Sequence, residues 1–252
     1  MKDKRAKILN GILPVLTVII LILVWAVAAA LVDSEYILPS VKLTAEKFFA
    51  LFFDKTFYSA FFLTLLRSLI AFIFSFAVAF VLAIFSTKFD LFKSAVSPVI
   101  SVMRALPTIA VVLLLLFWTN SQVAPVIVTT LVVLPTLYTH IESAFFALDK
   151  TIAEAGRVDG ADEIRVFTKI QLPQAMPSIY SGIGGGISLN FKLMVAAEVV
   201  AQTANSIGYL LNTSKVYFEI AQMLATVCVA VIFGVIVEFI FNRLSKKASG
   251  WK

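Results

Sequence analysis

The sequence predicts an all-α integral membrane protein with six transmembrane helices, and three observations support this prediction. First, 60% of the 252 residues are hydrophobic and the mean hydropathy is +0.97, which is more apolar surface than a water-soluble domain of this length needs. Second, several apolar runs reach the roughly 20 residues that a helix needs to cross a bilayer core. Third, 9 of the 36 charged residues lie in residues 149–173, which indicates a water-exposed loop between two spans.

Six apolar segments are expected to form a single transmembrane domain over residues 1–252. The first segment, residues 8–32, has no charged residue over 25 positions, whereas the apolar region of a cleavable signal peptide typically has about 7–15 residues. We therefore favour an uncleaved first span, although Ala26-Val27-Ala28 resembles a cleavage site. The other expected spans are residues 57–86, 98–118, 123–141, 175–201 and 220–241.

Two of these spans contain residues that affect how the helices run. Pro107 lies inside the segment 98–118 and must break or kink it, because proline lacks the N–H that a helix interior requires. A short loop, residues 87–97, is expected to precede that segment. Gly182 and Gly186 form a G-x-x-x-G pattern in the fifth span, which allows close helix approach. We favour packing within the chain over a dimer contact for these glycines.

The distribution of basic residues predicts the orientation of the chain. Six spans place both termini and the loop 149–173 on one side of the membrane. That side holds 15 of the 21 Lys and Arg residues, the other side holds four, and two lie within spans. The positive-inside rule then places both termini and the loop in the cytoplasm, with the chain as a multi-pass membrane protein.

The loop 149–173 has an internal pattern of two short helices. Residues 151–158 suit one helix, Gly160 breaks it because glycine reaches positive φ without strain, and residues 161–170 suit a second. Leu172-Pro173 is expected to end the second helix, because a residue before proline is disfavoured in the helical region. A helix this short is marginal alone in water, so its apolar stripe is expected to dock on another surface; the stripe comprises Ile164, Phe167 and Ile170.

The spacing of this loop, E-A-G-x-x-x-G-x(9)-I-x-L-P from residue 154 to residue 173, resembles the EAA loop of ABC-importer permeases, with Gly156 in place of the second alanine. The resemblance implies a type I ABC-importer permease fold in the inner membrane of a bacterial cell. In that fold this loop is the coupling segment and sits in a cleft of an ATP-hydrolysing subunit. The alternatives are a solvated loop or an amphipathic turn on its own membrane. The resemblance assigns ATPase docking to Glu154, Ala155, Gly156, Gly160, Ala161, Asp162, Ile164, Phe167, Ile170, Leu172 and Pro173.

Short strings elsewhere are similar to the nitrate/sulfonate/taurine class of these permeases. This class implies a small anionic solute, or a pyrimidine-type precursor, delivered by an extracytoplasmic solute-binding protein. It also implies two cytoplasmic ABC ATPases and a second copy of the permease. The chain departs from the class in lacking most glycines of its second span. The similar strings are residues 37–40, 67–68, 104–110, 195–198 and 208–210.

The sequence contains no set of residues that indicates catalysis. It has no G-x(4)-G-K-[ST] phosphate loop, so ATP hydrolysis is expected on a separate chain, and no cofactor is expected on this one. The single Cys228 excludes a disulfide within one chain, and the single His140 argues against a multi-histidine metal site. We interpret the net charge of +6 as a sign of membrane topology and expect lipid, not nucleic acid, as a contact.

Three charged residues within expected spans are candidates for a substrate path: Arg67, Lys192 and Glu198. A charge inside a bilayer is costly and is usually functional or paired. Lys192 and Glu198 are six residues apart and therefore point about 120° away from each other on one helix. The alternative is a structural ion pair between spans. An ion-coupled secondary transporter or channel without an ATPase is the rival function.

Overall fold

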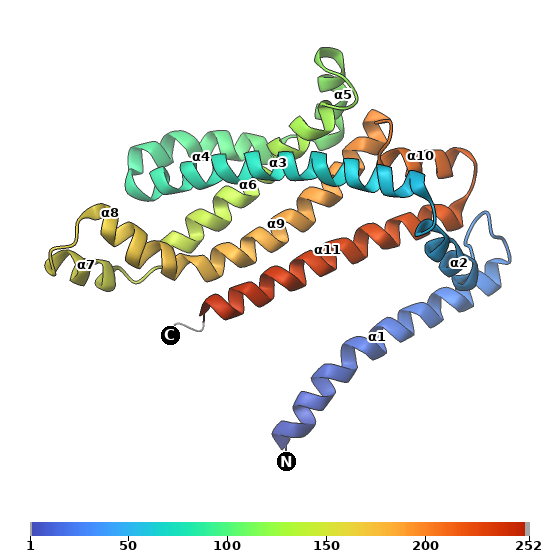
Figure 1. Cartoon of the computed structure of the whole chain (residues 1–252), viewed down its shortest axis with the longest axis horizontal. Helices are drawn as coiled ribbons and strands as arrows, with labels where there is room; N and C mark the ends of the chain where they lie inside the picture. Colours follow the sequence, from blue (N-terminus) through green and yellow to red (C-terminus); the bar gives the residue numbers. More distant parts are fainter. Residues whose placement is uncertain (1, 250–252) are drawn as a thin grey trace. The chain divides into compact units, whose positions relative to one another are not determined.

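The computed structural model describes residues 2–249, which form helices without any strand in that range. The chain divides into two compact units. Figure 1 labels their helices. The smaller unit comprises residues 1–58 and 210–229, and the larger comprises residues 59–209 and 230–252. The two expected sites, the loop 149–173 and the charged residues of the spans, lie in the larger unit. Lys252, one of the 15 basic residues expected on the cytoplasmic side, lies outside the described residues.

The smaller unit is built on the helices α1 (Lys2–Val32) and α2 (Val41–Leu51). The indole N–H of Trp25 donates a hydrogen bond to the carbonyl oxygen of Pro39 at 3.1 Å, which holds the connection against α1. Ser40 caps α2 by accepting a hydrogen bond from the Leu43 N–H at 3.2 Å. The unit also takes in most of α10 (Ile207–Val216) and the first part of α11 (Ile220–Ser249).

The larger unit has its core where α3, α6 and α9 meet. Phe72 of α3, Leu137 of α6 and Ile179 of α9 are buried in one apolar cluster, and α6 and α9 run side by side in Figure 1. The unit is made by α3 (Lys55–Lys88), α4 (Asp90–Ala105), α5 (Thr108–Trp118), α6 (Ala124–Phe146), α7 (Lys150–Val158), α8 (Glu163–Val166), the π-helix η1 (Phe167–Gln171) and α9 (Leu172–Ala201), together with the rest of α11.

Glycines on α9 allow the close approach of α6. A Cβ atom added to Gly186 would lie 2.6 Å from Leu137 Cδ2, and one added to Gly182 would lie 3.3 Å from His140 Cβ. Both glycines of the G-x-x-x-G pattern therefore pack against α6 of the same chain, which is the arrangement that the sequence analysis favoured.

Five described helices are long and apolar enough to cross a membrane, and the pair α4 and α5 forms a sixth span if it counts as one broken span. The two helices of that pair meet at 94°. The predicted break at Pro107 is confirmed, and Leu106 before it is extended, with ψ of 125°. The predicted loop 87–97 is wrong, because only Phe89 separates α3 from α4. Asp90 begins α4, where an acidic side chain suits the helix dipole.

The predicted helix end at Leu172-Pro173 is also wrong. Helical structure is continuous from Glu163 to Ala201, through η1. The Leu172 N–H bonds to the Phe167 carbonyl, five residues earlier, which is the π-helix pattern. Pro173 then falls in the first turn of α9, where its missing N–H is tolerated. The loop 149–173 is therefore joined rigidly to the fifth span.

Candidate functional site in the loop 149–173 and a buried polar network

The loop begins with a well-capped helix. One carboxylate oxygen of Asp149 accepts hydrogen bonds from the Thr151 N–H at 2.9 Å and the Thr151 hydroxyl at 2.7 Å. These bonds hold the pKa of Asp149 below its usual value, the side-chain bond having the larger effect. Helix α7 then ends at Val158, and Gly160 adopts a φ of +86°, a conformation that favours glycine. The predicted break at Gly160 is confirmed.

The second helix of the loop starts with its own cap. Asp162 Oδ1 accepts a hydrogen bond from the Arg165 N–H at 2.9 Å, so Asp162 precedes the first turn of α8 and does not lie within it. Arg157 Nε lies 2.6 Å from Glu163 Oε1, which ties α7 to α8. This hydrogen bond raises the pKa of Arg157 above its usual value. Because both side chains are exposed, the pair orients the two helices more than it stabilises them.

The apolar stripe of the second helix divides between the inside and the outside of the chain. The Phe167 ring stacks on the Phe145 ring, with centroids 5.8 Å apart, and Lys88 Nζ lies 5.5 Å from its centre. Ile170 packs toward Gly156, where an added Cβ would lie 2.6 Å from Ile170 Cδ1. Ile164, by contrast, is 72% exposed. Phe167 and Ile170 therefore anchor the loop on its own chain, and Ile164 remains available to a partner.

Three apolar side chains of the loop are exposed, and we call them the apolar triad: Ile152 at 45%, Val158 at 87% and Ile164 at 72% exposure. Sequence reasoning singled out only Ile164, because Ile152 and Val158 belong to α7 and do not follow the stripe of the second helix. Of the other predicted docking residues, Ala161 and Leu172 are half-buried, and the following are exposed: Glu154, Ala155, Gly160, Asp162 and Pro173.

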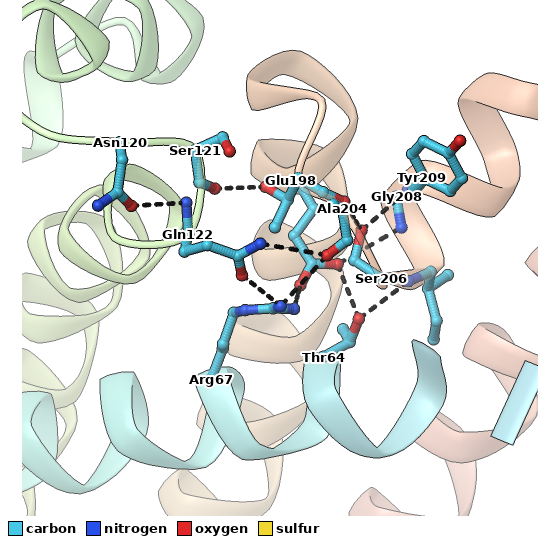
Figure 2. A network of polar contacts seen from close by, with 12 residues as sticks. Thr64, Arg67, Asn120, Ser121, Gln122, Glu198, Ala204, Ser206, Gly208 and Tyr209 are labelled. Atoms are coloured by element: carbon cyan, nitrogen blue, oxygen red, sulfur yellow. Dashed lines mark hydrogen bonds and ion pairs between the residues drawn. The ribbon is translucent and has the colours of Figure 1, made fainter. Parts of the chain in front are cut away.

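The second candidate site is a buried network around Glu198 of α9 (Figure 2). The Glu198 side chain is fully buried, and Arg67 Nη1 of α3 lies 2.8 Å from its Oε1. Its Oε2 accepts hydrogen bonds from the Thr64 hydroxyl at 2.8 Å and the Gly208 N–H at 3.4 Å. A buried carboxylate needs this many partners, because an unpaired charge in an apolar interior is strongly destabilising.

The network extends from Glu198 to two connecting segments. Arg67 Nη2 donates to Gln122 Oε1 at 2.5 Å and to the Ala204 carbonyl at 3.4 Å. The Thr203 hydroxyl donates to the Ser121 carbonyl at 2.6 Å. Through these bonds the network joins α3, the turn before α6, the end of α9 and the segment 203–208 (Figure 2).

Lys192 does not take part in this network. It lies on the exposed side of α9. A Cβ atom added to Gly234 of α11 would lie 3.5 Å from Lys192 Cε. The alternative of an ion pair between spans therefore holds for Glu198, with Arg67 as its partner.

Sequence reasoning missed Thr64, Gln122 and Gly208. Only Thr64 carried a signal, since it lies three residues before Arg67 and shares its helix face. Among the described side chains, no group of three or more His, Cys, Asp or Glu residues could hold a metal ion.

Comparison with known proteins identifies the family. The family described as "Binding-protein-dependent transport system inner membrane component" matches residues 78–250, more than half of the chain. The chain belongs to this family. It is a multi-pass inner membrane protein, and the span prediction, the apolar composition and the resemblance of the loop 149–173 all agree with this membership.

Relatives of this inner membrane component are ABC transporter permeases. A probable ABC transporter permease of Brucella abortus is 20% identical over 65% of this chain and 66% of its own length, just under two thirds. The taurine transport system permease protein TauC of Escherichia coli K12 is 21% identical over 90% of this chain and 84% of its own. The riboflavin transport system permease protein RibX of Chloroflexus aurantiacus is 25% identical over 82% of this chain and 77% of its own length.

Solved structures share the fold of this inner membrane component. A chain of an amino acid ABC transporter crystallised with histidines superposes with a TM-score of 0.65 at 16% identity, covering 76% of this chain and 94% of its own. A bacterial alginate ABC transporter was solved in complex with an alginate-bound periplasmic protein. Its chain superposes with a TM-score of 0.59 at 18% identity, covering 98% of this chain and 96% of its own. The predicted all-helical permease fold is confirmed.

Proposed function

We propose that this chain is the permease subunit of an ATP-driven importer, and that its loop 149–173 docks on a cytoplasmic ATPase. The apolar triad is the single observation that carries the docking proposal. Ile152, Val158 and Ile164 expose apolar surface on a loop whose remaining surface is strongly charged. Exposed apolar side chains gain free energy when a partner covers them. Family membership supports the same assignment.

Coupling follows from the continuity of the second loop helix with α9. Because residues 163–201 are helical without a break, a displacement of the docked loop moves α9 as one body. The 30 residues of α9 extend about 45 Å, and Glu198 lies near the end remote from the loop. ATP-dependent closure of the partner subunits therefore acts on the contacts that α9 makes with α3 through Arg67.

The other partners and the topology belong to the same proposal. Both termini and the loop lie in the cytoplasm, a solute-binding protein delivers the solute from the other side, and a second copy of the chain completes the path. The alginate transporter, whose structure includes a periplasmic protein, supports such a delivery protein. The solute is a small anion of the nitrate, sulfonate or taurine kind or a pyrimidine-type precursor. TauC and RibX, named for taurine and riboflavin, support small organic solutes. Family membership disfavours an ion-coupled transporter without an ATPase.

The test is co-purification with a candidate ABC ATPase expressed together with this chain. Ile164→Asp places a charge in the apolar triad at a 72% exposed position, so the ATPase should be lost while the permease still elutes as a folded species. Ile164→Met keeps an apolar side chain there and should retain the ATPase. Retention by Ile164→Asp, or loss by Ile164→Met, would contradict docking through the triad. Phe167→Asp is a poorer probe, because Phe167 packs on Phe145 within the chain.

A further inference from the structure

Helix α4 carries a polar stripe on its exposed side. Its members recur at spacings of three, four and three residues and occupy an arc of about 80°; they are Ser94, Ser97, Ser101 and Arg104, all exposed. A second exposed arc of the same helix, which we call the apolar stripe, holds Leu91, Ala95, Val99 and Val102. A helix that contacts lipid alone would not need the polar stripe, so the two stripes of α4 face different surroundings.

Arg104, which the count of basic residues placed on the cytoplasmic side, lies at the depth of a membrane interior. Its Nη2 donates to the Pro135 carbonyl at 3.2 Å and to the Thr139 hydroxyl. Pro135 is 11 residues from each end of α6, which places it about 16 Å from either end of a helix long enough to span a membrane. A charged side chain at such a depth almost always faces a partner or a water-filled cavity, because hydrocarbon cannot solvate it.

The guanidinium group of Arg104 keeps donors free for a further partner. Both hydrogen bonds of Arg104 use Nη2. Among the described side chains, Nε and Nη1 have no partner and no acid lies within ion-pair distance. Glu142, the next acid along α6, already forms an ion pair with Lys93 at 3.5 Å and accepts a hydrogen bond from the Tyr138 hydroxyl at 2.8 Å. Arg67 differs in this respect, since Glu198 neutralises it.

We propose that the polar stripe of α4 lines a water-filled part of the translocation path, and that Arg104 binds the anionic group of the solute there. Nε and Nη1 donate from different sides of the guanidinium plane, so each can give a separate charge-assisted hydrogen bond to an oxygen of a carboxylate or sulfonate. The Pro135 carbonyl and Thr139 hold the group in place from α6. The inference rests on the proposed transport function and names the chemistry of the solute: a small organic anion.

The experiment measures the access and charge preference of a cysteine placed next to Arg104. In a Cys228→Ser background, which removes the only native cysteine, Ser101→Cys tests the polar stripe and Val102→Cys tests the apolar stripe. Each variant, reconstituted in proteoliposomes made leaky to small molecules, reacts with anionic sulfonatoethyl methanethiosulfonate or its cationic trimethylammonioethyl analogue. We expect Ser101→Cys to react at least about tenfold faster with the anionic reagent, because a nearby unscreened positive charge attracts it. Val102→Cys should react slowly with both.

Substitutions of Arg104 then assign the charge preference. Adding Arg104→Gln to Ser101→Cys should abolish the preference, whereas Arg104→Lys should keep it. Methanesulfonate should protect Ser101→Cys from labelling and acetamide should not, which tests the anion site without changing Arg104. Equal labelling of Ser101→Cys and Val102→Cys, a preference that survives Arg104→Gln, or equal protection by the two solutes would each overturn the proposal. The labelling needs no ATPase, so a failed docking test leaves it intact, and the two failures are distinguishable.

Discussion

The two ends of α9 are built in opposite ways. At the end that follows the loop 149–173, apolar side chains are exposed and the joining ion pair, Arg157 with Glu163, lies on the surface. At the other end Glu198 is completely buried and has charged, hydroxyl and amide partners. A surface that leaves apolar groups exposed is suited to a partner from outside, whereas a buried network with matched donors and acceptors fixes the chain to itself.

This contrast teaches how one helix can serve two tasks. The π-helix at residues 167–171 lets the loop and α9 form one continuous helical body. The proposed docking surface and the buried network are therefore mechanically linked, although they share no contact. Substitutions at the network should change folding stability, and substitutions at the loop surface should change assembly. The predictions below test that division, from the largest expected effect to the smallest.

Removing the buried carboxylate should have the largest effect. Glu198→Ala leaves Arg67 without its ionic partner and Thr64 and Gly208 without an acceptor, which should cost about 3–5 kcal/mol of unfolding free energy. Glu198→Gln keeps the shape and most hydrogen bonds and should cost less. Denaturant or thermal unfolding in detergent measures both. Equal losses would mean that charge pairing, not hydrogen bonding, dominates the network.

Packing at Gly208 should come next. A Cβ at this position would lie 2.4 Å from Glu198 Cβ and 2.6 Å from the Val199 backbone nitrogen, so Gly208→Ala should destabilise the protein by about 1–3 kcal/mol. Gly185 of α9 is the matched control, because an added Cβ would meet nothing within 4 Å. Gly185→Ala should instead stabilise by up to about 1 kcal/mol through helix propensity. The same unfolding assay compares the two, and a stabilising Gly208→Ala would show that the segment 203–208 gives way easily.

Two aspartate substitutions in the loop should separate anchoring from docking. Phe167→Asp removes a ring stack and places a charge against the apolar core, so unfolding free energy should fall by about 1–3 kcal/mol. Ile164→Asp, at an exposed position, should change it by no more than about 0.5 kcal/mol. Thermal unfolding of the permease without its ATPase gives both values. Similar losses for the two would place Ile164 inside the fold and weaken the assignment of the apolar triad.

The smallest effect should be the pH dependence of the α7 cap. Hydrogen bonds from Thr151 lower the pKa of Asp149 below 3.8, so the cap is fully present above the unfolded pKa and is lost as the pH falls through the folded value. Amide exchange at the start of α7, corrected for intrinsic rates, should therefore accelerate below about pH 4. Asp149→Asn also caps the helix but does not titrate, so its amide exchange should not accelerate in this way. If exchange in Asp149→Asn accelerates at the same pH, the titrating group is another acid.

Local patterns were enough to predict much of this protein. Long apolar runs predicted the spans, Pro107 predicted the broken third span, and the spacing from Glu154 to Pro173 indicated the family. These features depend on bilayer thickness, on the missing proline N–H and on a contiguous motif, all of which are properties of neighbouring residues. The continuation of the helix through Leu172-Pro173 was not predictable, because a π-turn accommodates the proline.

By itself, the sequence determined that this chain is a multi-span helical permease with a charged loop of a recognisable pattern. Only the tertiary structure decided which residues of that loop face outward, because Phe167 and Ile170 are covered by residues distant from them in sequence or across the Gly160 turn. The tertiary structure also separated Arg67, which Glu198 neutralises across 131 positions, from Arg104, which no described acid neutralises. Ion pairing depends on distance in space, and a sequence reports only distance along the chain.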